Sequence, residues 1–285
     1  MMNTSLNISG LLLTGLVELY RDIEKHTSDL AIPYLIIGAT ARDIVLVHGY
    51  GAAIERGTRD IDFGIQVRTW QEFEKLKAKL IESGFAPHKE KVHQLSTIDS
   101  ESMPWEIDII PFGLIAGEQQ EIAWPPKYEF IMRVLGFAEA YENALSVIIA
   151  ENPVLKVHVA SPAGMLLLKL ISWLERPEDI RPKDAADIYY LTSHYAKIPS
   201  VIDDIYDGGY MEQHNFHEHK AGTMKLAEDA AKIARPDTLR YIKERLFAQG
   251  DKLDKLTLEI SRLTHASYQE AENLLAIINH VFQKD

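Results

Sequence analysis

The chain has 285 residues, of which 46% are hydrophobic and 25% charged, so its composition is that of a folded protein with one large domain or two ordinary ones. It contains no cysteine, which excludes disulfides, thiolate nucleophiles and cysteine-ligated zinc sites and fits a cytoplasmic protein. The formal net charge of -12 disfavours tight nonspecific binding of nucleic acid, although local basic residues can still hold one nucleotide or one RNA end.

An apolar run at 11–17 lies near the N-terminus, within a segment of helical spacing at 8–28. The run is too short to span a bilayer, lacks a basic flank and continues into charged residues. We therefore expect it to belong to the first helix of the fold. No other segment approaches the length of a membrane span, so we expect no membrane partner.

Elements of a sheet follow in chain order. Residues 34–37 predict a buried strand that ends at Gly38, and a helix is expected from about Thr40 to His48. The next strand is expected at 60–67, followed by an amphipathic helix at 70–83. Further strands are expected at 93–98, 105–111, 133–135, 145–149 and 154–159. Strands joined first by helices and then by turns predict an α/β (α+β) fold, with a mixed sheet and helices packed on it.

The pattern changes at Ser161-Pro162, where serine at the N-cap and proline at the first helical position favour a helix start. The segment 203–219 is rich in Gly, His and Asp and is expected to be a loop. We therefore predict two domains, an α/β domain over 1–160 and an all-helical domain over 161–285. The expected helices of the second domain are 162–176, 182–195, 218–234, 236–248, 251–263 and 267–283.

Three acidic residues on predicted strands suggest a metal site. Asp60 and Asp62 are two residues apart, so their side chains share one strand face. Neighbouring carboxylates repel each other, and a hard divalent cation removes that conflict. Asp108 precedes apolar residues, where an unpaired carboxylate is costly, and it could complete the group from an adjacent strand. A solvated polar strand face is the alternative explanation for these acids.

The turn Gly38-Ala39-Thr40 joins a predicted strand to a predicted helix. A turn without bulk lets backbone N–H groups face a ligand, and a helix N-terminus favours negative charge, so the turn suits a triphosphate. Many such turns use glycine for geometry alone. Together with the acids, the turn suggests phosphoryl transfer, in which two metal ions clamp the reacting oxygens and a carboxylate takes the proton of the attacking hydroxyl.

The order of a Gly38-Ala39 turn, a helix, Asp60-x-Asp62 and a later strand with Asp108 resembles the nucleotidyltransferase superfamily typified by DNA polymerase β. That family usually has Gly-Gly or Gly-Ser in the turn, and here Thr40 would supply the hydroxyl. The resemblance implies an NTP substrate and Mg²⁺, with two ions expected and Mn²⁺ as the alternative. It assigns metal binding to Asp60, Asp62 and Asp108, and nucleotide contacts to Gly38, Ala39, Thr40 and Arg42.

Within this superfamily the chain resembles the AbiEii/AbiGii-type nucleotidyltransferases, which include toxins of bacterial toxin–antitoxin systems. Lys169, on an apolar helix, resembles their motif lysine, and 183–188 resembles their basic–Asp–x–x–Asp motif. The resemblance implies a catalytic role for Lys169, a nucleotide contact for Asp184, and a helical domain that contributes to the nucleotide and acceptor cleft. From the residues alone, Lys169 could merely extend past leucines, Asp184 could favour a helix N-terminus, and Asp187 could pair with Lys183.

These observations predict a metal-dependent enzyme that moves a nucleoside monophosphate from an NTP to an acceptor hydroxyl. The resemblance implies that the acceptor is RNA, including tRNA, and that the protein is a toxin with a cognate antitoxin. Nucleotidylation of a small cationic antibiotic is an alternative that the acidic charge suits. Two further alternatives are addition of CCA to tRNA and a catalytically degenerate nucleotide-binding or protein-interaction module.

Overall fold

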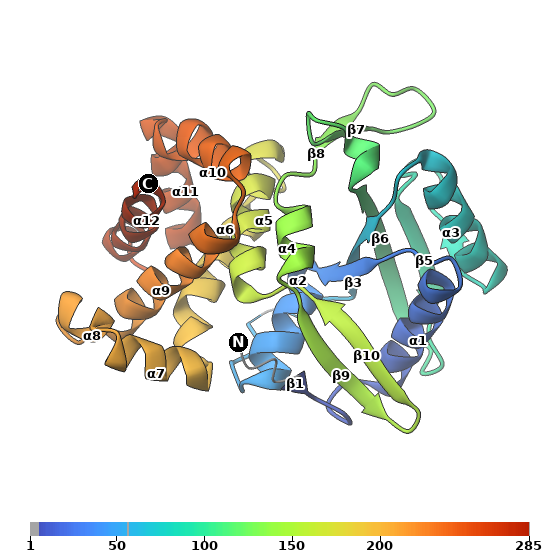
Figure 1. The fold of residues 1–285 in the computed structure, drawn as a ribbon, viewed down its shortest axis with the longest axis horizontal. Helices are drawn as coiled ribbons and strands as arrows, with labels where there is room; N and C mark the ends of the chain where they lie inside the picture. The colour runs from blue at the N-terminus through green and yellow to red at the C-terminus, as the bar shows by residue number, and fades with distance from the viewer. Residues whose placement is uncertain (1–5, 56, 285) are drawn as a thin grey trace. The chain divides into compact units, whose positions relative to one another are not determined.

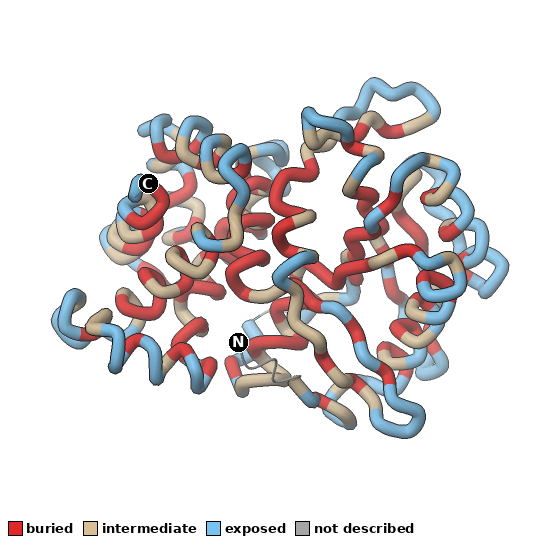
Figure 2. Tube along the Cα trace, viewed as in Figure 1, coloured by how far each residue is buried: buried red, intermediate tan, exposed pale blue. Residues whose placement is uncertain are grey.

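The structure is a computed structural model that describes residues 6–55 and 57–284. It divides into two compact units (Figure 1). The first unit ends at Ser161 and the second begins at Pro162, except that Tyr50–Ala52 group with the second. Each unit has its own buried core, which Figure 2 shows along the strands of the first and the helices of the second.

The first unit is built on a mixed sheet. Among the described residues eight strands form it, in the order β1-β9-β10-β2-β3-β6-β5-β4. Strand β3 runs parallel to β6 and antiparallel to β2, and β5 is antiparallel to β6. The strands are β1 Leu6–Asn7, β2 Tyr34–Ile37, β3 Asp60–Gln66, β4 Ala86–Pro87, β5 Gln94–Ile98, β6 Pro104–Phe112, β9 Leu145–Glu151 and β10 Val154–Val159. A separate pair joins β7 Glu121–Ala123 to β8 Ile131–Arg133.

One face of the β3–β6 part of the sheet is apolar and covered by helix. Ile61 and Ile107 are fully buried there, and Phe63 packs edge-on against Tyr20 of α1, with ring centroids 6.0 Å apart. Figure 1 shows α1 and α3 side by side. The helices of this unit are α1 Thr14–Asp29, α2 Gly38–Arg42, α3 Trp70–Glu82 and α4 Phe137–Glu142, and a π-helical segment, Asp43–Gly49, continues α2. The alternation of side chains therefore leaves the polar residues of β3 and β6 on the opposite face.

The second unit is helical, and α5 is its apolar centre. Most of the side chains of α5 are buried, including Leu166, Leu170 and Trp173. Prolines open α6, α7 and α10, as expected from the fit of proline to the first helical turn. The helices are α5 Pro162–Glu175, α6 Pro182–His194, α7 Pro199–Asp207, α8 Tyr210–Gln213, α9 Glu218–Ile233, α10 Pro236–Ile242, α11 Gly250–Leu263 and α12 Tyr268–Gln283.

The predicted fold class, a mixed sheet with packed helices followed by an all-helical part, is confirmed. In the described part of the chain, no helix combines the length and the apolar character that a membrane span requires. The predicted loop at 203–219 is wrong, because it contains the end of α7, all of α8 and the start of α9. Its polar composition concealed Ile205 and Met211, which are buried and anchor these short helices.

Smaller differences concern where elements begin and end. The first helix begins at Thr14 and not at residue 8, and Leu11 and Leu13 before it are more than half exposed. The strand expected at 133–135 lies at Ile131–Arg133, outside the main sheet.

Candidate active site

The strand register brings the three predicted acids to one face of the sheet. Asp62 of β3 lies opposite Asp108 of β6, and Asp60 lies opposite Glu106. Adjacent strands are about 4.8 Å apart, so these four carboxylates project from neighbouring backbone positions. Asp60 and Glu106 are exposed, while Asp62 and Asp108 are half-buried.

Asp62 also contacts the predicted glycine turn. Gly38 follows β2, has a φ of +72° and opens α2. A Cβ atom built on Gly38 would overlap the carboxylate oxygen Oδ2 of Asp62. Both the backbone conformation and the space at this position therefore require glycine, and the turn and the acid pair form one site.

The other residues of the turn are buried, and two of them hold the turn in place through polar contacts. The Thr40 hydroxyl donates to the carbonyl oxygen of Asp60 at 2.6 Å, and Ala39 is 7% exposed. The Arg42 guanidinium is 4% exposed and pairs with Asp43 at 2.8 Å. In this structure the Thr40 hydroxyl and the Arg42 guanidinium therefore bond within the protein and fix the turn to β3 and to the helix.

The donor chemistry of the acids fits Mg²⁺, which prefers oxygen ligands. Across 6–55 and 57–284, however, no three Asp, Glu or His side chains already form a group arranged to hold a metal ion. Carboxylates without a cation repel one another, and Asp62 leans toward Gly38. The backbone positions of Asp60, Asp62 and Asp108 thus suit a shared ion, and the side chains would have to rotate toward one another to bind it.

Gln94 of β5 was not anticipated as part of this site. It lies opposite Asp108 in the antiparallel register of β5 and β6 and is 6% exposed. Its side-chain Nε2 donates to Asp108 Oδ1 at 2.9 Å and to Glu106 Oε2 at 3.3 Å. A single amide therefore orients two of the carboxylates. The signal in the sequence was weak: a glutamine near the start of a predicted strand.

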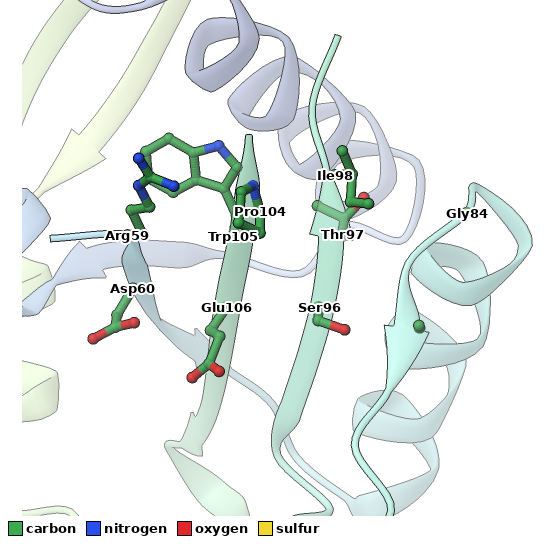
Figure 3. A pocket seen from close by; sticks show the side chains of 10 residues that line it. Arg59, Asp60, Gly84, Ser96, Thr97, Ile98, Pro104, Trp105 and Glu106 are labelled. Atoms are coloured by element: carbon green, nitrogen blue, oxygen red, sulfur yellow. The ribbon is translucent and has the colours of Figure 1, made fainter. Parts of the chain in front are cut away.

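A groove of about 660 Å³ adjoins the acids within the first unit. Figure 3 shows Asp60, Glu106 and Ser96 on three neighbouring strands, with their side chains on the same side. Ile98, Pro104, Trp105 and Arg59 also line the groove. The groove is therefore acidic where it meets the site and more apolar farther away.

The motif residues of the second unit pair with one another. The Lys169 ammonium lies 3.0 Å from Asp184 and 2.7 Å from Asp187, and Arg176 also pairs with Asp184 at 3.0 Å. Burial alone would lower the pKa of Lys169, but Asp187 and Asp184 outweigh it and the pKa is raised. Asp187 thus pairs with Lys169 in addition to any contact with Lys183. Two carboxylates therefore neutralise the ammonium of Lys169 in this structure and tie α5 to α6.

Solved structures similar to this chain are nucleotidyltransferases. The lincosamide antibiotic adenylyltransferase LnuA, lincomycin-bound, is 18% identical over 62% of this chain and 96% of that chain, with a TM-score of 0.37. The antibiotic-resistance factor ANT(2'')-Ia is 21% identical over 73% and 100%, with a TM-score of 0.40. The Thermotoga maritima CCA-adding enzyme complexed with tRNA is 11% identical over 95% and 82%, with a TM-score of 0.25. At these TM-scores the likeness carries no argument about this chain.

The comparison of sequences is more decisive. No curated protein matches the chain. The sequence model of one family, described as nucleotidyl transferase AbiEii toxin, Type IV TA system, matches residues 25–262. That range holds the acid pair, Asp108 and the Lys169 helix, and it spans most of the chain. The chain therefore belongs to the AbiEii nucleotidyltransferase toxin family, as its motifs predicted, and is a nucleotidyltransferase.

Proposed function

We propose that this nucleotidyltransferase requires Mg²⁺ and transfers a nucleoside monophosphate from an NTP to a hydroxyl at the end of an RNA, tRNA included. The observation that carries the proposal is the register of β3 and β6, which sets Asp62 opposite Asp108 with Asp60 on the same face. A sheet face with three adjacent acids has little structural purpose, because the acids repel each other unless a cation binds there.

In this proposal Asp60, Asp62 and Asp108 hold the metal. Bound Mg²⁺, or Mn²⁺ as the alternative, would neutralise charge that develops on the phosphate oxygens, and two ions are expected. The protein supplies carboxylates on a rigid sheet, and Gln94 fixes the orientation of Asp108. Catalysis then rests on positioning and charge compensation, as in other phosphoryl transfers.

The Gly38 turn is the proposed site for the triphosphate. The Asp62 carboxylate fills the space beside Gly38 in this structure, so its rotation toward a metal ion would let a phosphate approach the N–H groups at the start of α2. Ala39 adds little bulk there. The residues proposed for chemistry lie in the first unit, and the Lys169–Asp184 pair is proposed to stabilise the helical unit.

The family description supports a toxin role, with a cognate antitoxin as partner. RNA is chosen as the acceptor because the motif resemblance implies it. A second candidate acceptor is a small cationic antibiotic. The observation that favours it is charge, because Asp60 and Glu106 outnumber Arg59 in the groove and the chain carries a net charge of -12.

The proposal is tested by incubating the full chain with Mg²⁺, each of the four labelled NTPs in turn, and total cellular RNA or an aminoglycoside. We expect label on RNA, none after chelation of the metal, and none with Asp62→Asn. Label confined to the aminoglycoside would replace RNA with the second candidate. Undiminished transfer by Asp62→Asn would refute the proposed metal site.

A further inference from the structure

We propose that the groove beside Asp60 binds the terminal nucleoside of the acceptor RNA, an inference that rests on the proposed transfer reaction. In this proposal Glu106 takes the proton of the attacking ribose hydroxyl, and Gln94 is the positioning residue that holds Glu106. Neither residue belongs to the motifs that identified the chain.

The residue pairs along β5 and β6 change in character from one end of the strands to the other. The register pairs Pro104 with Ile98, Glu106 with Ser96, and Asp108 with Gln94. Residues two apart on a strand share a face, so these three pairs form one ladder with steps of about 6.7 Å. The ladder runs from an apolar outer pair, through an acid and a hydroxyl, to the proposed metal ligand.

The order of the strands puts the Gly38 turn and the groove on different sides of the acids. In the sheet the strands lie in the order β2, β3, β6, β5 and β4. The Gly38 turn follows β2, on one side of the acids, whereas residues of β3, β6, β5 and β4 form the groove. A triphosphate at the turn and an acceptor in the groove would therefore approach Asp60, Asp62 and Asp108 from opposite sides. In-line transfer requires this arrangement, because the attacking and leaving oxygens lie on opposite sides of the phosphorus.

The two ends of the groove differ in chemistry. At the inner end the carboxylates of Asp60 and Glu106 can accept hydrogen bonds from ribose hydroxyls. At the outer end Ile98 is 71% exposed and lies beside Pro104, which gives an apolar surface for a base. Arg59, which also lines the groove, would offer a cation to the preceding phosphate. A nucleoside uses both ends of the groove, whereas a polycationic sugar uses only the acidic one.

The transfer forms one bond at phosphorus and breaks another. The acceptor hydroxyl oxygen bonds to the α-phosphorus of the NTP, the bond from that phosphorus to the bridging oxygen breaks, and pyrophosphate leaves with the electron pair. The hydroxyl proton passes to the Glu106 carboxylate. Gln94 donates to Asp108 and to Glu106 from one nitrogen, so it holds the proton acceptor at a fixed distance from the proposed metal ligand.

The first test is the variant Glu106→Gln, which keeps the size of the side chain and removes its basicity. We expect kcat for transfer to an oligoribonucleotide to fall about 10²–10⁴-fold, the usual contribution of a general base, while the affinity for the NTP is unchanged. Gln94→Leu should cause a smaller fall in kcat with little change in KM for the oligoribonucleotide, and Gln94→Asn, which keeps the amide, should fall less than Gln94→Leu. A residue with a merely structural role would show no such split between kcat and KM.

The second test is Ile98→Asp, which should raise KM for the oligoribonucleotide at least tenfold with little change in kcat. The matched control is Val154→Asp, at an exposed position in another part of the sheet, which should leave both constants unchanged. Wild-type kcat in Glu106→Gln, or an unchanged KM in Ile98→Asp, would overturn the inference.

The outcomes separate this inference from the function on which it rests. If Asp62→Asn abolishes transfer while Glu106→Gln and Ile98→Asp behave as wild type, only the groove assignment fails. If Asp62→Asn also transfers normally, the proposed metal site fails and the inference fails with it. Transfer to an aminoglycoside alone, unaffected by Ile98→Asp, would overturn the assignment of a nucleoside.

Discussion

Gly38 shows how one residue links the turn to the acids. Its φ of +72° is strained for any other residue, and a Cβ atom there would overlap the Asp62 carboxylate. Gly51 has a nearly equal φ of +69° but nothing within 4 Å of a built Cβ atom. Substitutions at the two glycines therefore distinguish the cost of the backbone conformation from the cost of the contact with Asp62.

We predict that Gly51→Ala destabilises the protein by about 1–2 kcal/mol, the cost of a left-handed conformation for a residue with a side chain. Gly38→Ala should carry that cost and also displace Asp62, so transfer should fall well below that of Gly51→Ala. Urea denaturation and initial transfer rates measure the two effects. Equal activity in the two variants would show that the contact with Asp62 has no functional importance.

At the scale of elements, the ion pairs between α5 and α6 are the clearest stabilising contacts in the helical unit. Lys169 is held by Asp184 and Asp187, and Asp184 is fully buried. Breaking a buried pair from one side leaves a carboxylate without its full compensation, which typically costs about 3–5 kcal/mol.

Lys169→Met should therefore lower the free energy of unfolding by a few kcal/mol, whereas Lys183→Met, at an exposed position of α6, should change it little. Urea denaturation of both variants, followed by circular dichroism, provides the comparison. A loss of transfer in Lys169→Met without loss of stability would instead indicate direct contact with the nucleotide.

The packing of α9 against α12 makes the stability of the folded protein depend on pH. Burial lowers the pKa of His219, with the Glu270 carboxylate opposing that effect and His217 and His194 adding to it. The unfolded chain therefore binds a proton more readily than the folded chain as the pH falls through about 6.5. Stability should be full above that pH and should decrease below it.

His219→Gln should weaken this dependence. The difference in the free energy of unfolding between pH 7.5 and pH 5.5, measured with urea, should be smaller in the variant than in the wild type. His280, near the C-terminal end of α12, gives a control substitution, His280→Gln. An identical pH dependence in His219→Gln and the wild type would contradict the assignment.

At the scale of the molecule, periodicity and capping residues predicted most elements and the fold class. Strands 34–37 and 154–159 and the helices that begin at Pro162, Pro182 and Pro236 lie where the sequence places them. The segment 203–219 was predicted to be a loop from its polar composition, but its few apolar residues are buried in short helices. The short strands β1, β4 and β7 gave no periodic signal, since two or three residues cannot show one.

The candidate site was predictable only in part. The residues of the acid face and the Gly38 turn are visible in the sequence because their spacing follows strand geometry. The partners of Lys169 and the contacts of Gln94 depend on which helices and strands lie side by side, and a single sequence does not contain that register. The buried position of Arg42 likewise follows from packing and not from residue type.

The central claim is that three carboxylates on one sheet face hold the metal for NMP transfer, and the most direct measurement compares the transfer rate of the wild type with that of Asp62→Asn and Asp108→Asn. At saturating Mg²⁺ and NTP, with folding verified by circular dichroism, we expect both variants to lose at least about 10²–10³-fold in rate. A rate within twofold of the wild type in either variant would contradict the account.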